Sequence, residues 1–201
     1  MKTAIATDTN SGVKPEMLRE SGLYLLPMPV LVDGQTYAEG TEISNQQLYE
    51  AMKQHKEVST SQPSPGQLLD LWDGILADGY DQIVYIPMSS GLSGSCFTAL
   101  QLAEEYDGKV QVVDNHRISV TQQESFFTAY RLAQRGHSAE DIKTYLEAHA
   151  YDASIYITVD SLEYLKKGGR ITPAVAAFAT VLNLKPVLEI QGDKLDTFAK
   201  A

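Results

Sequence analysis

The chain has 201 residues, of which 43% are hydrophobic and 21% charged, a composition that supports an apolar core and excludes wholesale disorder. Its formal net charge of −10 would repel nucleic acids and anionic membrane surfaces. The single cysteine, Cys96, cannot form an internal disulfide, and no apolar run is long enough to span a bilayer. We therefore expect a soluble protein of the reducing cytoplasm.

The first part of the chain alternates short apolar runs with amphipathic segments. Residues 3–8 predict a strand that enters a polar turn, after which Pro15 is expected to open a helix. Residues 23–32 contain two prolines, which predict an edge strand or extended arm and not a central strand, closed by a turn at Asp33-Gly34. The next predicted elements are a helix from Ser44 to about His55, a helix capped by Ser64 and Pro65, and a buried strand over 82–87.

The remaining pattern continues this alternation as far as His149. Helices are predicted near 95–106, 121–135 and 138–149, with a strand over 109–113. Such alternation predicts an α/β protein whose parallel sheet carries ligand loops at the carboxyl ends of its strands. Beyond His149 we expect a strand over 154–159, a short helix over 161–166, an apolar helix over 173–182 and a hairpin over 185–196. A boundary near Asp152 would separate a parallel-sheet domain (1–152) from a second α/β domain (153–201).

Two hydroxyl-rich loops are the most informative feature of the sequence. The first loop, Ser59-Thr60-Ser61-Gln62-Pro63-Ser64, precedes a predicted helix. The second, Ser89-Ser90-Gly91-Leu92-Ser93-Gly94-Ser95, connects a predicted strand to the predicted helix that follows it. Hydroxyls and backbone N–H groups at a helix N-terminus bind a carboxylate or phosphate. Helix capping explains either loop taken singly, but the occurrence of two such loops favours an anion site.

Other chemistries receive less support from the sequence. Ser93 could serve as the nucleophile of a hydrolase, with His116 as the only histidine expected near the same crevice, but the glycine pattern of a nucleophile elbow is incomplete. Nucleotide-binding fingerprints are absent. Asp8, Asp114 and Asp160 each follow a predicted strand, where turn formation is the more usual role than metal binding. We expect neither a metal nor a cofactor.

A basic, glycine-rich segment, Lys166-Lys167-Gly168-Gly169-Arg170, stands out in this acidic chain. A glycine C-cap with cations in the last helical turn accounts for its lysines, but it accounts less well for Arg170. The apolar helix predicted over 173–182 would lie in the core or line an apolar cavity, and its small alanines would leave room for an alkyl chain.

Together these motifs resemble those of the DegV family, bacterial fatty-acid-binding proteins whose FakB members present a fatty acid to a separate kinase. The resemblance covers the whole chain and rests on four motifs in order. They are the opening Ile5-Ala6-Thr7-Asp8-Thr9, the two hydroxyl loops, and Leu165-Lys166-Lys167-Gly168-Gly169-Arg170 followed by Leu184-Lys185-Pro186. The resemblance implies that Ser61 and Ser93, with Thr60 close by, bind the carboxylate, and that Arg170 lies near the head group where the phosphate arrives.

Family members are longer, and the resemblance implies that they continue past the predicted hairpin with elements that include a functional histidine. The second domain is therefore expected to be incomplete here. The sequence predicts a non-enzymatic protein that binds a long-chain fatty acid and, by resemblance, hands it to a fatty acid kinase for phospholipid synthesis. Two alternatives stay open: a Ser93-dependent hydrolase of a small ester or phosphoester, and a sensor of a small anionic metabolite.

Overall fold

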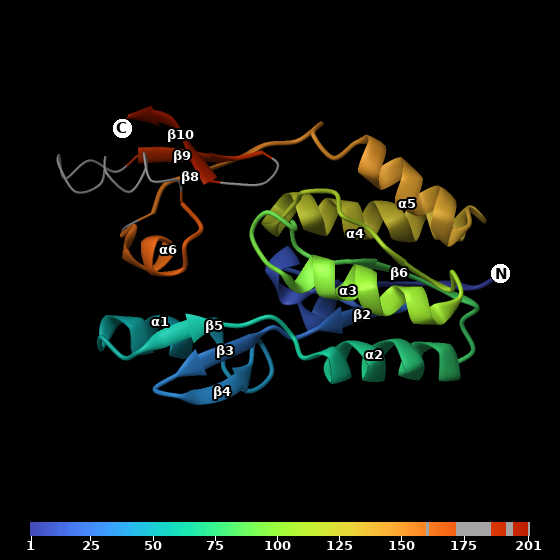
Figure 1. Ribbon diagram of the computed structural model, residues 1–201, viewed down its shortest axis with the longest axis horizontal. Helices are drawn as coiled ribbons and strands as arrows, with labels where there is room; N and C mark the ends of the chain where they lie inside the picture. Colours follow the sequence, from blue (N-terminus) through green and yellow to red (C-terminus); the bar gives the residue numbers. More distant parts are fainter. Residues whose placement is uncertain (160, 172–185, 192–194, 201) are drawn as a thin grey trace.

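The computed structural model describes residues 1–159, 161–171, 186–191 and 195–200 (Figure 1). The strands are β1 (Thr3–Asp8), β2 (Leu23–Leu26), β3 (Pro29–Val32), β4 (Gln35–Ala38), β5 (Val58–Thr60), β6 (Gln82–Ile86), β7 (Val110–Val112), β8 (Ile155–Ile157), β9 (Pro186–Ile190) and β10 (Leu195–Lys200). The α-helices are α1 (Asn45–Lys53), α2 (Pro65–Ala77), α3 (Ser95–Ala103), α4 (Ser119–Gln134), α5 (Ala139–Ala148) and α6 (Glu163–Lys167).

A four-stranded parallel sheet in the order β2-β1-β6-β7 organises the first part of the chain. The prediction of an α/β protein built on a parallel sheet is confirmed. Because β2 and β6 pair with opposite sides of β1, the chain reverses its direction of travel across the sheet between β1 and β6. In open α/β sheets, ligands bind beyond the carboxyl ends of the strands at such a switch point.

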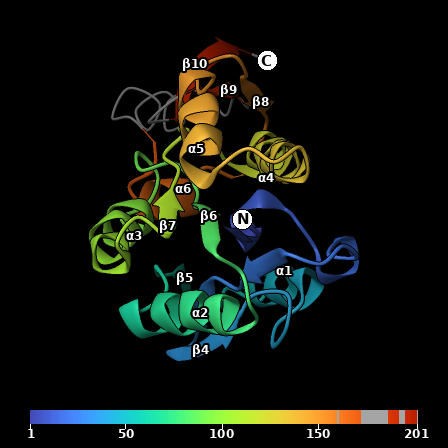
Figure 2. The ribbon, with the colours of Figure 1, turned by 90° about the vertical axis from the view of Figure 1, so that its right-hand side faces the viewer.

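Helices cover both faces of this sheet, which gives three layers (Figure 2). Side chains alternate along each strand, so Ile83 and Tyr85 face α2 and α3, whereas Val84 and Ile86 face α4 and α5. Trp72 of α2 is fully buried, with its ring edge-on to Tyr85 at a centroid distance of 5.7 Å. The sequence pattern of buried strands between amphipathic helices thus produces two apolar cores.

The segment predicted as a single edge strand or arm over 23–32 contains two strands of different sheets. The edge position holds for β2, which forms one border of the parallel sheet. The prediction is wrong for β3, which lies between β4 and β5 in a small antiparallel sheet. Pro29 is tolerated there because it is the first residue of the strand. Asp33 and Gly34, with φ of 50° and 79°, form the tight turn to β4, as expected for a two-residue hairpin.

The other differences from the sequence analysis are local. Pro15 opens only a three-residue 3-10 turn, Pro15–Met17, which is too short to form a helix and has no fully buried residue. The strands β4 and β5 were not predicted, since both are mostly exposed and lack an apolar pattern. The predicted helix over 95–106 ends as an α-helix at Ala103 and continues as a 3-10 turn, Glu104–Tyr106.

A third sheet, with the antiparallel order β10-β9-β8, follows the parallel one and includes the predicted hairpin. Its inner face contributes Leu188, Ile190 and Leu195 to an apolar cluster shared with residues of the first sheet's loops. The helix predicted over 173–182 and the hairpin turn at Gly192-Asp193 lie outside the described residues. In the part of the chain that is described, no helix combines the length and apolarity needed to cross a bilayer.

Candidate functional site

A buried polar network holds the carboxyl ends of β1 and β6 together. Asp8 ends β1 and is fully buried, and its carboxylate accepts the backbone N–H groups of Asn10 (3.0 Å) and Met88 (2.9 Å). The side-chain amide of Gln122, from α4, donates to the Asp8 carboxylate and to the carbonyl of Ile86, both at 3.1 Å. These contacts fix the start of the loop that follows β6.

Asp8 therefore has a structural role in holding this loop. Burial raises the pKa of its carboxyl group above the ordinary value, while hydrogen bonds from Met88, Gln122 and Asn10 act in the opposite direction. Asp114 Oδ1 accepts the backbone N–H of Ser90 at 3.3 Å, and Asp160 lies outside the described residues. Among the residues that are described, no group of three or more His, Cys, Asp or Glu side chains is arranged to hold a metal ion.

The second hydroxyl loop lies between β6 and α3. Ser89 accepts the N–H of Gly91 at 3.2 Å, and Ser93 accepts the N–H of Ser95 at 3.2 Å, while Gly94 is the N-cap of α3. Because Ser93 uses its oxygen as the acceptor, its own O–H remains available to donate. Ser95 is 1% exposed, and within the described structure its hydroxyl has no hydrogen-bond partner. The hydroxyls of Ser93 and Ser95 thus lie at the N-terminus of α3, which has no side-chain cap.

The first hydroxyl loop begins within β5, whose last residue is Thr60. Thr60 and Ser61 are exposed, and no hydrogen bond to their hydroxyls is seen among the described residues; Ser61 is held by its N–H, which donates to Pro29 at 3.2 Å. The capping role falls instead to Ser64, which forms a reciprocal capping box with Gln67 at the start of α2. The capping interpretation is therefore correct for Ser64 and leaves Thr60 and Ser61 without that function.

Gln62 connects the two loops. Its side-chain amide donates to Thr98 Oγ1 of α3 at 3.2 Å. Its Oε1 lies only 2.9 Å from the position that a Cβ on Gly94 would occupy. The residues next to Gln62 and Gly94 are Ser61 and Ser93, so the structure brings the two expected carboxylate-binding segments side by side.

Arg170 extends from the basic segment to the same place. Its Nε donates to the carbonyl of Leu92 at 3.2 Å, and Nη1 donates to the carbonyl of Gly168. A Cβ on Gly168 would stand 3.1 Å from Nη1, so the guanidinium packs close to the backbone at this glycine. Gly168 is the C-cap of α6, and Gly169, with φ of 69°, is the left-handed residue that follows it, as the glycine C-cap interpretation predicts. Helix capping thus accounts for the two glycines of the basic segment. Arg170 has a separate role, because it donates to Leu92 in the second hydroxyl loop.

Leu92 marks the boundary between polar and apolar surroundings. Its carbonyl accepts from Arg170, whereas its side chain, 5% exposed, belongs to the apolar cluster that includes Met28, Met88 and Leu188. This cluster combines side chains that follow the parallel sheet with side chains from the inner face of the β8–β10 sheet. Residues 92 and 93 thus lie between an apolar interior and a set of hydroxyl and guanidinium donors.

A serine hydrolase would need a base beside Ser93. The Ser93 hydroxyl contacts the N–H of Ser95, and in the described part of the chain no histidine is hydrogen-bonded to it. His116 Nδ1 lies 3.8 Å from Asp114 Oδ1, and its ring stacks on Tyr151 at 5.4 Å. A nucleophile without an adjacent base is not activated for attack.

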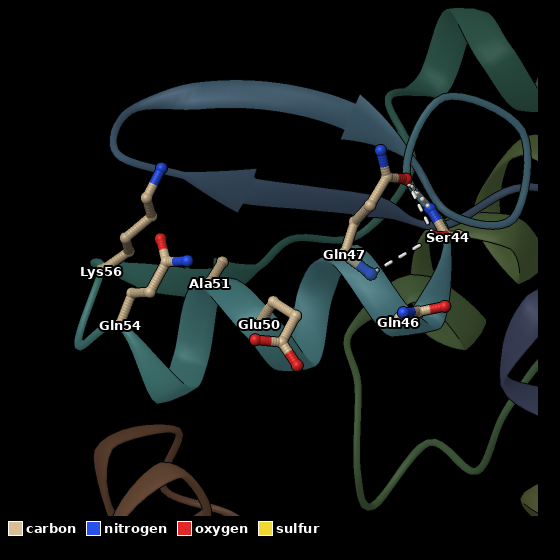
Figure 3. Close-up of a pocket in the computed structure, with 7 residues that line it drawn as sticks. All are labelled: Ser44, Gln46, Gln47, Glu50, Ala51, Gln54 and Lys56. Carbon is tan, nitrogen blue, oxygen red and sulfur yellow. Dashed lines mark hydrogen bonds between the residues drawn. The ribbon is translucent and has the colours of Figure 1, made fainter.

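Two surface hollows lie away from this region. One, of about 440 Å³, runs along α1 and is lined by Ser44, Gln46, Gln47, Glu50, Ala51, Gln54 and Lys56 (Figure 3). The other, of about 520 Å³, is lined by residues of α5 together with Leu132 and His137. Neither includes Thr60, Ser61, Ser93 or Arg170, so the candidate site is defined by the hydrogen-bonded loops and the adjoining apolar cluster.

Comparison with known proteins gives the family. A family model described as "Uncharacterised protein, DegV family" matches residues 2–201. The chain belongs to the DegV family. A DegV domain-containing protein of Deinococcus radiodurans is 35% identical over 197 residues, which are 98% of this chain and 70% of the relative. One from Streptomyces coelicolor is 32% identical over the same shares.

Solved structures of DegV proteins share the fold. A DegV protein of Thermus thermophilus, described by its fatty acid binding, superposes with a TM-score of 0.89 and 29% identity, covering 100% of this chain and 72% of the other. DegV of Bacillus subtilis, a fatty acid binding protein, gives 0.87 and 30% over the same shares. A stearic acid-binding protein of Eubacterium ventriosum gives 0.88 and 27%, covering 99% of this chain and 70% of that one.

Sequence reasoning missed two residues that organise this DegV site. Gln122 is fully buried on the face of α4 that also buries Ser125, Phe126 and Ala129. Its helical spacing from Phe126 and Ala129 could have indicated a buried polar side chain on this face. Gln62 carries no comparable signal, because its side chain is exposed and its partner Thr98 is distant in sequence.

Proposed function

We propose that this DegV protein binds a long-chain fatty acid, with the carboxylate at Ser61, Ser93 and the adjacent Thr60. The observation that carries the proposal is the position of Leu92 and Ser93, which are adjacent in the second hydroxyl loop. The Leu92 side chain belongs to the apolar cluster, whereas its carbonyl and the Ser93 hydroxyl lie among polar groups. The fatty acid binding named for the Thermus thermophilus and Bacillus subtilis proteins supports it.

The hydroxyl loops suit a carboxylate because they offer donors without a strong counter-charge. Ser93 retains its O–H for donation, and it precedes the N-terminus of α3, where helix N–H groups favour an anion. Ser61 supplies a second hydroxyl on the neighbouring loop. Such uncharged donors orient the acid and leave its oxygen accessible to a second reactant.

The apolar cluster suits the tail. Each methylene removed from water contributes about 0.8 kcal/mol, so a chain of about 14 methylenes supplies on the order of 10 kcal/mol before ordering costs. In the proposed arrangement the tail enters beside Leu92 and is covered by Met28, Met88 and the inner face of the β8–β10 sheet. The tail then provides affinity, and the hydroxyls provide orientation.

We further propose, from the resemblance to FakB proteins, that the bound acid is presented to a separate ATP-dependent kinase. The acyl phosphate would then enter phospholipid synthesis. Arg170 supports this role because, among the described residues, Nε and Nη1 each donate to one carbonyl, and the guanidinium has further N–H groups that could bind an incoming phosphate. The protein itself would bind and present the acid without catalysing a reaction.

Lipid extraction tests the binding proposal. The purified protein is denatured, extracted with organic solvent and analysed by mass spectrometry for fatty acid in stoichiometric amount. We expect a long-chain fatty acid from the wild type and much less from Ser93→Ala, which loses a charge-assisted hydrogen bond worth a factor of about ten or more in affinity. Turnover of generic esters that is abolished by Ser93→Ala, with no lipid recovered, would instead establish the hydrolase.

A further inference from the structure

The Gln62 side chain is placed as a clamp between the two hydroxyl loops. Its amide N–H₂ donates to Thr98 Oγ1 at 3.2 Å, and the N–H of Thr98 donates to the Gly94 carbonyl at 3.1 Å. Gln62 thus joins the Ser61 loop to the first turn of α3, the helix that begins two residues after Ser93. The Gln62 side chain, which makes this connection, caps neither α2 nor α3.

Gly94 makes room for this clamp. Its φ of −69° is available to any residue, so the backbone does not require glycine there. A Cβ at this position would instead stand 2.9 Å from Gln62 Oε1, the one described heavy atom within 4 Å. The glycine therefore permits the close approach of Gln62.

We propose that Gln62 is a positioning residue, which sets the distance between the Ser61 and Ser93 hydroxyls so that one carboxylate can engage both. This inference rests on the proposed fatty acid function and assigns Gln62 no contact with the acid. Without the clamp, the exposed Ser61 loop would have to be ordered at the moment of binding. That ordering has an entropic cost, which weakens head-group recognition.

The test compares laurate with dodecanol, an acid and an alcohol of equal chain length. Calorimetric titrations use the full chain stripped of lipid, as wild type, Gln62→Ala and Thr98→Val. We expect each variant to weaken laurate about threefold to tenfold, the range for one hydrogen bond, and to leave dodecanol binding unchanged. Gln101→Ala, an exposed glutamine on the same helix, is the matched control and should change neither.

Gly94→Ala provides a second route to the same interaction. In the wild-type background the new methyl group displaces the Gln62 amide, so laurate binding should weaken as it does in Gln62→Ala. In the Gln62→Ala background the methyl group meets no such atom, so the added substitution should have little further effect. Additive effects of the two substitutions would contradict the clamp.

The outcomes separate this inference from the proposed function. If wild type binds laurate but Gln62→Ala binds it equally well, the clamp is wrong and the fatty acid function stands. If Gln62→Ala loses laurate and dodecanol together with a lower melting temperature, Gln62 is only structural and the inference is overturned. If wild type binds neither laurate nor a longer acid, the proposed function itself fails.

Discussion

Neighbouring serines in the site loops have different hydrogen-bond partners, and they are expected to have different roles. Ser64 accepts from Gln67 in a capping box, whereas Ser61 is exposed with only its N–H engaged. The two hydroxyls lie three positions apart in one loop. A comparison of their substitutions therefore separates stability from ligand binding.

Ser64→Ala should lower the free energy of unfolding by about 1 kcal/mol, because α2 loses its cap, and should change fatty acid affinity little. Ser61→Ala should do the reverse, with weaker fatty acid binding and nearly unchanged stability. Urea unfolding and calorimetric titration of both variants check this. Equal effects of the two substitutions on binding would show that the Ser61 hydroxyl has no separate role.

Cys96 is expected to be inert in the native protein. Its thiol is fully buried in α3, and burial together with the nearby Asp114 carboxylate raises its pKa to about 12. The thiolate needed for reaction is therefore scarce at neutral pH. Ellman's reagent should label the native protein very slowly and the guanidinium-unfolded protein at once. Fast labelling of the native protein would mean that α3 opens readily.

The stability of the protein should depend on pH through Asp8. Because burial raises the pKa of this carboxyl group, the folded state binds its proton up to a higher pH than the unfolded chain does. The contribution of Asp8 to the free energy of unfolding is therefore lost as the pH rises from about 4 through the raised pKa.

Asp8→Asn removes this titration. Urea unfolding over the same pH interval should show the stability of wild type falling relative to that of Asp8→Asn. The substitution also places an amide among the N–H donors, but this cost to the free energy of unfolding does not depend on pH. It therefore does not affect a comparison of the slopes of stability against pH. Parallel pH profiles for the two proteins would contradict the raised pKa.

At the scale of elements, the site depends on where the sheet order reverses. The loop that carries Ser93 follows β6 and Asp8 ends β1, the two strands at the switch point, and Gln122 of α4 donates hydrogen bonds to the ends of both strands. The alternation of strands and helices in the sequence was sufficient to predict the parallel sheet; the ligand site at the carboxyl ends of its strands stays a prediction.

Elements with little apolar content were harder to predict. β4 pairs with β3 across the Asp33-Gly34 turn, and β5 pairs with β3 over a longer separation in sequence; neither strand has a buried apolar pattern of its own. Serine-rich loops indicated an anion site, but the contact that joins them runs through Gln62 and Thr98, 36 positions apart. Such contacts follow from tertiary structure and cannot be read from spacing.

In the proposed function, the apolar cluster provides affinity for the acid and the hydroxyl loops orient its carboxylate. The basic α6 segment lies between the β8–β10 sheet and the region of α1 (Figure 1), where Tyr164 donates to the Met52 carbonyl at 3.5 Å. The predicted boundary near Asp152 remains a proposal. If it is correct, the carboxylate site belongs to the first domain, and the tail contacts both domains.

Affinity should therefore rise with the length of the acid. Each added methylene is expected to tighten binding about threefold to fourfold until the apolar cluster is filled. Titrations with saturated acids from octanoate to stearate measure this slope. Equal affinity for acetate and palmitate would identify a small-carboxylate sensor instead.

A crystal structure of the chain with palmitate would show where the carboxylate and the tail bind. We expect the carboxylate within hydrogen-bond distance of the Ser61 and Ser93 hydroxyls, with the tail beside Leu92 among the side chains of the apolar cluster. A carboxylate bound elsewhere, or a tail that runs over the outer surface while both serines face solvent, would contradict it.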